Sequence, residues 1–188
     1  MDHPIQDIHR KLVEKCQSGD RKAQYELYNA YARAMYNLCF RMLNQAEEAS
    51  DLLQDSFIDA FTRIHSFRFE STFGAWLKRI VINKCINAIQ KRKLELVDRE
   101  IPETYPDSSN EDGIDEEMLQ LSVDRVKKAM MQLPDNARLV FSLYLFEGYD
   151  HTEIADILHI TESTSKTQFM RAKQRVKEIL LAMPDYTH

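Results

Sequence analysis

The sequence predicts an all-α protein made of two small helical domains joined by a flexible acidic linker. Glycine and proline are scarce, with four and five in 188 residues. Apolar residues recur at steps of three and four, which is the helical period. They make up 44% of the chain, which is enough for a core in each domain. One segment, residues 94–121, has a composition unlike the rest.

The first domain is predicted to cover residues 1–93 and to contain four helices. An apolar stripe predicts a first helix that ends near Gly19, and Asp20 can cap a second helix that runs to about Leu43. The core candidates of this second helix are Tyr25, Tyr28, Ala32, Met35, Tyr36 and Cys39. Residues 46–64 predict a third helix with an acidic outer side. A loop over residues 65–71 precedes a fourth helix, predicted over residues 72–93.

The fourth helix carries a basic face. Residues 78–93 contain six basic residues and no acidic one, with Asn83, Asn87 and Gln90 among them. Four aromatic residues lie upstream: Phe67, Phe69, Phe73 and Trp76. Basic and amide groups beside aromatic rings suit a groove that holds phosphates and unstacked bases. In the alternative interpretation Phe73, Trp76, Ile80 and Ile89 are core and the lysines are solvated. For Trp76 the core position is favoured, because it lies at helical spacing from Phe73 and Ile80.

Residues 94–121 predict the linker. They contain ten acidic residues and one arginine, together with prolines and serines. The remainder of the chain carries 24 basic and 20 acidic residues. The overall charge of −5 therefore does not exclude a nucleic-acid-binding protein.

The second domain is predicted over residues 122–183, followed by a tail at 184–188. Helices are expected over about 115–132 and 137–147, with a break at Pro134. Asp150 and Glu153 form a capping-box pattern, and Thr161 can cap one more helix. The outer face of that last helix carries Ser163, Lys166, Thr167, Met170, Arg171 and Gln174. The pattern predicts a helix-turn-helix whose second helix enters the major groove; a packed helical pair is the alternative.

Several classes of site are not expected. The three cysteines lie among apolar helical positions, which predicts reduced core residues rather than a redox or zinc site. There is no glycine-rich phosphate loop, no nucleophile arrangement and no metal-ligand spacing, so we expect no enzyme activity, no cofactor and no metal. Without a signal-peptide pattern or a membrane-spanning run, a cytoplasmic protein with no membrane insertion of its own is expected.

Two stretches resemble the sigma-70 family of RNA polymerase sigma factors, of the extracytoplasmic-function (ECF) type. Residues 51–57 (DLLQDSF) and 67–83 (FRFESTFGAWLKRIVIN) resemble region 2 of that family. Residues 133–148, Ile154-Ala155 and residues 164–173 (TSKTQFMRAK) resemble region 4. The two matches occur in the order of the family and bracket a linker of suitable length.

The resemblance implies an alternative sigma factor that directs core RNA polymerase to specific promoters and helps to melt the −10 region. It implies polymerase docking through Asp51, Gln54, Asp55 and Asp59. It implies −10 DNA contacts at Phe67, Lys78, Arg79, Asn83, Lys84, Asn87 and Lys91, with Phe67 and Asn83 holding a flipped base. It implies −35 DNA contacts at Lys166, Thr167, Met170, Arg171, Lys173 and Arg175. An anti-sigma factor is a common further partner in the family.

Two positions depart from the family pattern. Ser163-Thr164-Ser165 stands where Gly-Thr-Val is frequent, and Gln168 stands where a basic residue is common. Because Ser165 lies on the inner stripe, we expect its hydroxyl to bond the carbonyl of Thr161.

Two other functions remain open: a free-standing helix-turn-helix DNA-binding regulator, and a helical protein-interaction module without a DNA role. The first needs no docking helix, and the basic face at 78–93 argues against the second.

Overall fold

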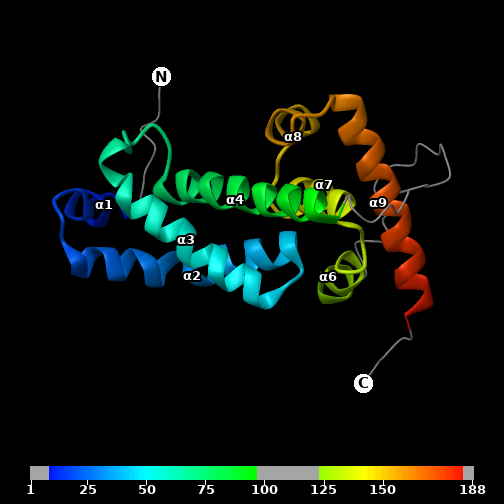
Figure 1. Ribbon diagram of the computed structural model, residues 1–188, viewed down its shortest axis with the longest axis horizontal. Helices are drawn as coiled ribbons and strands as arrows, with labels where there is room; N and C mark the ends of the chain where they lie inside the picture. The colour runs from blue at the N-terminus through cyan, green and yellow to red at the C-terminus, as the bar shows by residue number, and fades with distance from the viewer. Residues whose placement is uncertain (1–8, 97–122, 184–188) are drawn as a thin grey trace. The chain divides into compact units, whose positions relative to one another are not determined.

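The computed structural model describes residues 9–96 and 123–183. All regular structure within these residues is helical, which confirms the all-α prediction (Figure 1). The chain divides into two compact units, the first ending at Arg92 and the second beginning at Lys93. Most of the predicted linker and the predicted tail at 184–188 lie outside the described residues.

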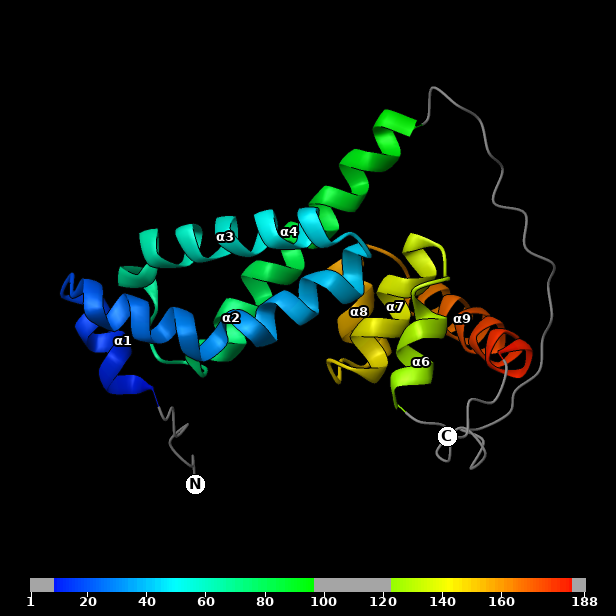
Figure 2. The ribbon, with the colours of Figure 1, turned by 90° about the horizontal axis from the view of Figure 1, so that it is seen from below.

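The first unit consists of four helices and one short 3₁₀ turn. In chain order they are α1 (Arg10–Gln17), α2 (Arg21–Leu43), α3 (Ala46–Thr62), the 3₁₀ helix η1 (Ile64–Ser66) and α4 (Phe73–Leu96). Figure 2 shows α4 crossing α2 and α3 at a steep angle and extending beyond them at its C-terminal end. The helix α4 thus continues past Leu94, where the linker was predicted to begin.

Side-chain hydrogen bonds cap the starts of α2 and α4. Asp20 Oδ1 accepts hydrogen bonds from the backbone N–H groups of Lys22, at 2.8 Å, and Ala23, at 3.2 Å, which confirms the predicted cap of α2. The chain reaches this cap through Gly19, whose φ of +87° lies in the region that glycine tolerates best. Thr72 Oγ1 accepts from the backbone N–H of Ala75 at the start of α4.

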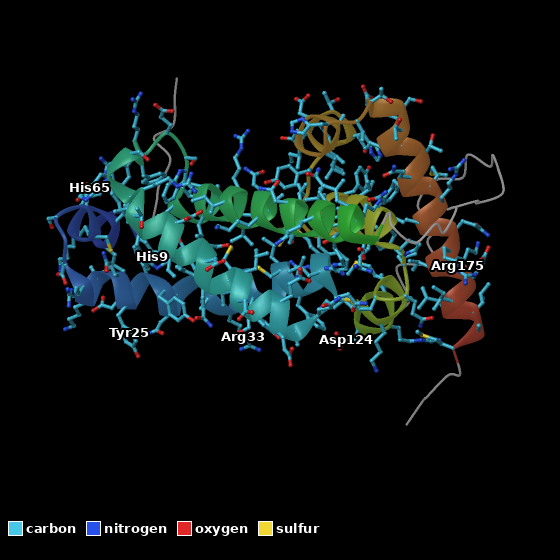
Figure 3. All side chains as sticks on the ribbon, viewed as in Figure 1. His9, Tyr25, Arg33, His65, Asp124 and Arg175 are labelled. Carbon is cyan, nitrogen blue, oxygen red and sulfur yellow. The ribbon has the colours of Figure 1, made fainter. Side chains whose placement is uncertain are left out.

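The core of the first unit is apolar. Its largest fully buried side chains are Leu27, Leu38, Met42, Leu43, Ile64, Phe73, Leu77, Ile82 and Ile89. Tyr25 was predicted to be core, and this prediction is wrong: its side chain is 66% exposed and projects from α2 (Figure 3). Tyr25 is two residues from both Ala23 and Leu27, which are buried, and helical neighbours at that spacing point in different directions.

The helix α4 lies close to α2 near its start and is paired with α3 near its end. At Gly74, a Cβ would lie 2.8 Å from Cε1 of Tyr31, so α2 and α4 approach closely there. Near the other end of α4, Arg92 Nη2 lies 2.6 Å from Glu48 Oε2 on α3. The three cysteines, Cys16, Cys39 and Cys85, are free and buried within this unit, as core residues should be.

The second unit is built around one long helix. Its elements are α6 (Val123–Met130), α7 (Asp135–Leu145), α8 (His151–Leu158) and α9 (Glu162–Ala182). The helix α9 packs against each of the other three (Figure 1). Of the helix predicted over 115–132, the part from Val123 is described, and it ends at Met130.

The caps of the helix-turn-helix are confirmed. Asp150 Oδ1 accepts from the backbone N–H of Glu153 at 2.8 Å, and the Glu153 carboxylate accepts from the backbone N–H of Asp150 at 2.9 Å. His159, at a φ of 55°, ends α8 in the left-handed conformation. Thr161 Oγ1 then accepts from the backbone N–H of Thr164 at 3.0 Å and begins α9.

Candidate nucleic-acid interface

A surface pocket of about 390 Å³ lies between α3 and α4. Its lining combines an aromatic ring, two amides, three cations and a carboxylate. The lining residues are Asp59, Arg63, Trp76, Arg79, Ile80, Asn83, Lys84 and Asn87. Aromatic, amide and basic groups in one concavity are what an unstacked base and its phosphate require.

Helical spacing brings this lining together. Trp76, Ile80, Asn83 and Asn87 follow one another at steps of four, three and four, so they share one face of α4. The opposite face is core, because Leu77, Val81, Cys85 and Ile89 are buried. The amides of Asn83 and Asn87 are exposed, which leaves them accessible to a bound molecule.

The electrostatics of the pocket are set by one carboxylate among several cations. Lys84 Nζ lies 2.9 Å from Asp59 Oδ2, and Arg63 Nη2 lies 3.3 Å from the same oxygen. The hydrogen bond from Lys84, aided by the charges of Lys84 and Arg63, lowers the pKa of the Asp59 carboxyl below its ordinary value. The carboxylate therefore remains ionised at neutral pH and holds both cations.

The second unit presents a polar and basic face on α9. Lys166, Thr167, Arg171 and Arg175 are exposed there, and Figure 3 shows Arg175 on the outer side of the helix. Lys166 Nζ lies 2.7 Å from Glu162 Oε1, and this hydrogen bond raises the pKa of Lys166. Arg175 Nη1 lies 3.0 Å from Glu178 Oε2. These are exposed pairs, which a phosphate can displace at little cost.

The opposite face of α9 is held by an aromatic cluster. The ring of His151 on α8 stacks on Tyr144, with 4.6 Å between centroids, and lies 5.6 Å from the ring of Phe169. Burial, followed by the nearby charge of Lys166, lowers the pKa of His151. The cluster joins α7, α8 and α9, so it fixes how the outer face of α9 is presented.

Comparison with known proteins identifies the chain. The family described as Sigma-70 region 2 matches residues 27–95, and the family described as Sigma-70, region 4 matches residues 123–176. The ECF RNA polymerase sigma factor SigW of Bacillus subtilis (strain 168) is 30% identical over 179 residues, which covers 91% of this chain and 96% of SigW. The chain belongs to the ECF sigma factors of the sigma-70 family. It is therefore a member of a family of transcription initiation factors.

Other relatives agree with this assignment. The RNA polymerase sigma-H factor of Pseudomonas aeruginosa is 29% identical over 185 residues, which covers 93% of this chain and 95% of that protein. Two solved structures share the fold of this sigma factor. CnrH, in complex with the cytosolic domain of CnrY, has a TM-score of 0.57 at 22% identity and covers 95% of this chain and all of that one. The sigma factor RpoE of Bartonella quintana, in complex with the anti-sigma factor NepR, has a TM-score of 0.56 at 24% identity. The match covers 86% of this chain and 98% of RpoE.

The predicted −10 residues of this sigma factor fall into two groups. Arg79, Asn83, Lys84 and Asn87 meet at the α3–α4 pocket. Lys78 and Lys91, also on α4, do not line it. Phe67 is 4% exposed and packs against the rings of Phe69, Phe73 and Trp76, so the structure does not place it beside Asn83 at the surface.

Trp76 supplies the aromatic ring of the pocket instead of Phe67. The sequence interpretation treated Trp76 as core, yet it is half-buried and lines the pocket. Its distance of seven residues from Asn83, two helical turns, is the sequence signal that places both on one face. Ile80, which the alternative interpretation placed in the core, is half-buried and also lines the pocket. Arg63 is a further lining residue that the sequence interpretation did not name.

The predicted polymerase-binding residues are also divided. Asp51, Gln54 and Asp55 are exposed together on α3, at the spacing of helical neighbours. Asp59, one turn further on, is engaged with Lys84 and Arg63 at the pocket. The acidic outer face of α3 thus merges into the pocket at Asp59.

One local prediction about this sigma factor is wrong. The Oγ of Ser165 lies 2.9 Å from Nδ1 of His151 and does not bond the carbonyl of Thr161. The hydroxyl turns to the ring because Ser165 is fully buried under α8, where His151 offers a polar partner. The predicted −35 residues Lys166, Thr167 and Arg171 are exposed, whereas Met170 and Lys173 are half-buried.

Within residues 9–96 and 123–183, no three metal-ligating side chains gather where they could hold an ion. None of the described helices has the length and apolar character that crossing a lipid bilayer requires.

Proposed function

We propose that this ECF sigma factor directs core RNA polymerase to specific promoters and opens the −10 element by accepting an extruded base in the α3–α4 pocket. The observation that carries the proposal is the lining of that pocket, where Trp76 and Asn83 share one face of α4 beside Lys84 and Arg79. It is a binding role, and we assign the chain no catalytic step of its own. The site of action is the cytoplasm, where polymerase and promoter DNA are found.

The roles divide along the chain. Residues 1–93 dock on polymerase and recognise the −10 element, residues 94–121 act as an acidic tether, and residues 122–183 recognise the −35 element. Asp51, Gln54 and Asp55 form the docking face, because they are exposed on α3 and lie on one side of the helix. The negative charges of Asp51 and Asp55 suit a basic surface on polymerase, and Gln54 adds a neutral amide to the same face.

The pocket lowers the cost of strand opening. Extruding a base costs a few kcal/mol of stacking and pairing, and stacking on an aromatic side chain returns about 1–3 kcal/mol per base. In this assignment Trp76 stacks on the base and Asn83 hydrogen-bonds its edge. Arg79 and Lys84 contact the adjoining phosphates, and Asn87, Lys78 and Lys91 extend the contact along α4.

The exposed face of α9 recognises the −35 element. Lys166, Thr167, Met170 and Arg171 are assigned to base edges, because they lie near the N-terminal half of the helix that enters the major groove. Lys173 and Arg175 are assigned to phosphates, which position the domain without reading sequence.

Polymerase is needed for the two domains to bind their DNA elements together. Each domain presents only a modest basic face, and the linker carries ten acidic residues that repel DNA. Docking on polymerase holds the domains near their two DNA elements, so the second contact forms at a high effective concentration. An anti-sigma factor is a further proposed partner, because the RpoE structure that shares this fold contains one.

Run-off transcription with purified core polymerase on a pool of genomic promoter fragments tests the proposal. We expect defined transcripts only when both core polymerase and this protein are present. A gel shift with promoter DNA in the absence of polymerase distinguishes a sigma factor from a free-standing regulator, because only the regulator would bind DNA tightly by itself. Tight, sequence-specific binding of the isolated protein at physiological salt, with no polymerase-dependent transcript, would contradict the proposal.

A further inference from the structure

We propose that the N-terminal helix α1 positions the loop at residues 67–72, and through it the α3–α4 pocket, by means of Gln17 and Arg10. The inference rests on the proposed function of that pocket in −10 recognition. The helix α1 lies outside residues 27–95, the part of the chain that matches sigma-70 region 2. It therefore adds a positioning element to the matched region.

Gln17 holds the start of the loop by two hydrogen bonds. Its Nε2 donates to the carbonyl of Ile64 at 2.9 Å and to the carbonyl of Phe67 at 3.0 Å. An amide nitrogen has two hydrogens, so both are used here. The two carbonyls belong to the first residue of η1 and to the residue that follows it. One side chain thus closes the turn from which the loop departs.

Arg10 holds the middle of the loop. Its guanidinium carbon lies 4.5 Å from the centroid of the Phe69 ring, in a cation–π contact. Phe69 has a φ of 60°, a left-handed conformation that costs free energy for a residue with a bulky side chain. Such a conformation persists only where neighbouring contacts hold it. Arg10 and the ring of Phe67, 4.9 Å from that of Phe69, are such contacts.

The loop transmits its position to the pocket through ring contacts. The Phe67 ring lies 5.2 Å from the Trp76 ring, and Trp76 lines the pocket. The backbone of Phe67 is bonded by Gln17, so a continuous chain of contacts runs from α1 to Trp76. A shift of the Phe67 backbone would move the ring on which we propose that the base stacks.

The test compares Gln17→Met and Arg10→Gln with the control Lys11→Gln. Gln17→Met keeps the length of the side chain but cannot donate a hydrogen bond. Arg10→Gln changes an exposed residue, so it tests the proposal even if the substitution at the half-buried Gln17 impairs folding. Lys11 is exposed on the same helix and its replacement should have no effect. Circular dichroism and thermal unfolding establish that each variant is folded.

The first readout uses the free protein. Trp76 is the single tryptophan of the chain, so its emission and its quenching by acrylamide report on the loop and pocket alone. We expect a changed emission maximum and stronger quenching in Gln17→Met, a smaller change in Arg10→Gln, and none in Lys11→Gln. A variant that is less stable but keeps the loop in place would have a lower unfolding temperature. Its Trp76 emission maximum and acrylamide quenching would be unchanged in the folded state. That result would overturn the proposal.

The second readout uses holoenzyme on two templates. On a duplex promoter we expect about a tenfold loss of transcription for Gln17→Met, the size that the loss of one or two hydrogen bonds produces. On a template premelted over the −10 region, activity should largely return. Equal losses on both templates would indicate a general defect and contradict the positioning role.

Asn83→Ala separates this inference from the proposed function. In one outcome Asn83→Ala fails on duplex DNA, while folded Gln17→Met and Arg10→Gln transcribe like the wild type. The proposed function of the pocket is then supported, and the positioning role of α1 is wrong. If Asn83→Ala is fully active, the proposed function of the pocket fails. In that case unchanged Trp76 quenching in Gln17→Met overturns the positioning of the loop, and changed quenching upholds it.

Discussion

Lys84 Nζ lies 2.9 Å from Asp59 Oδ2, so one cation of the α3–α4 pocket is paired with a carboxylate before any nucleic acid binds. Arg63 approaches the same oxygen at 3.3 Å. A DNA phosphate that enters the pocket must compete with Asp59 for these two cations. The carboxylate therefore weakens the contact with DNA while it keeps Lys84 in place.

Replacing Asp59 with Asn should strengthen binding of the −10 strand. The amide leaves Lys84 and Arg63 available to phosphate, so holoenzyme should bind a single-stranded −10 oligonucleotide more tightly. The logarithmic salt dependence should steepen by about 0.7 for each cation released. Fluorescence anisotropy over a series of KCl concentrations measures both effects. Glu47→Gln, exposed on the same helix, is the control, and equal slopes for the two variants would disprove this role of Asp59.

Replacing Asn83 with Ala should impair strand opening and spare −35 recognition. The variant loses the amide proposed to bond the extruded base, so the cost of unstacking is no longer offset. Transcription should fail on duplex promoters and recover substantially on a premelted template. Circular dichroism must first show that the variant is folded. A folded variant with full activity on duplex DNA would remove Asn83 from the mechanism.

Replacements on α9 should separate base readers from phosphate contacts. Lys166→Ala or Arg171→Ala should cost about 1–3 kcal/mol on the preferred −35 sequence and relax the preference at one position. Lys173→Ala or Arg175→Ala should weaken all sequences alike and flatten the salt dependence. Competition among −35 variants with holoenzyme measures both. Unchanged selectivity in both Lys166→Ala and Arg171→Ala would show that neither residue reads a base.

The second unit should lose stability below neutral pH because of His151. Its pKa is lowered from 6.5 in the folded protein, mainly by burial. The unfolded chain therefore binds the proton more readily, so protonation favours unfolding. Stability should be unaffected above about pH 6.5 and fall as the pH drops from there toward the folded-state pKa. Urea unfolding at a series of pH values, with His151→Gln as the comparison, measures this.

The His151→Gln variant removes the group that titrates. The amide can still hydrogen-bond Ser165 but carries no charge at any pH. The free energy of unfolding should therefore fall less steeply in the variant as the pH drops below about 6.5. The surrounding charges of Lys166, Glu162 and Asp150 are present in both proteins. Parallel slopes would show that these neighbours, and not His151, govern the acid sensitivity.

Removing Arg138 should destabilise the second unit selectively. The side chain is 3% exposed, donates from Nη1 to the carbonyl of Leu133 at 2.7 Å, and pairs with Asp135. Arg138→Ala removes a hydrogen bond to that carbonyl and an ion pair to that carboxylate, which costs about 3 kcal/mol. Calorimetry should show a lower unfolding temperature for the second unit and an unchanged unfolding temperature for the first. The surface control Lys128→Ala should change neither temperature.

Local features of this chain were predictable from sequence because their causes are local. Asp20, Asp150 and Thr161 cap helices through atoms two or three residues away, so composition and spacing identify them. The stripe on α9 that includes Phe169 and Val176 was predicted for the same reason, since helical period alone places it. The two-domain, all-helical organisation follows from these elements.

Contacts between distant residues were not predictable in this way. Ser165 bonds His151, fourteen residues earlier, because the packing of α8 on α9 brings them together. Phe67 lies before α4, so helical spacing does not place its ring, and only the packed structure shows that the ring is buried against Trp76. Gln17 meets the loop at residues 64 and 67 across a separation in sequence that no periodicity reveals.

The burial of Cys16, Cys39 and Cys85 has a practical use. Burial raises the pKa of Cys16 to about 11, and a hydrogen bond with Cys39 together with burial raises the pKa of Cys85. Thiols that are shielded and protonated react slowly with maleimide dyes at neutral pH. A cysteine introduced at a surface position of each domain would thus be labelled in preference to the native thiols. Energy transfer between two such dyes would follow the separation of the domains as polymerase and promoter bind.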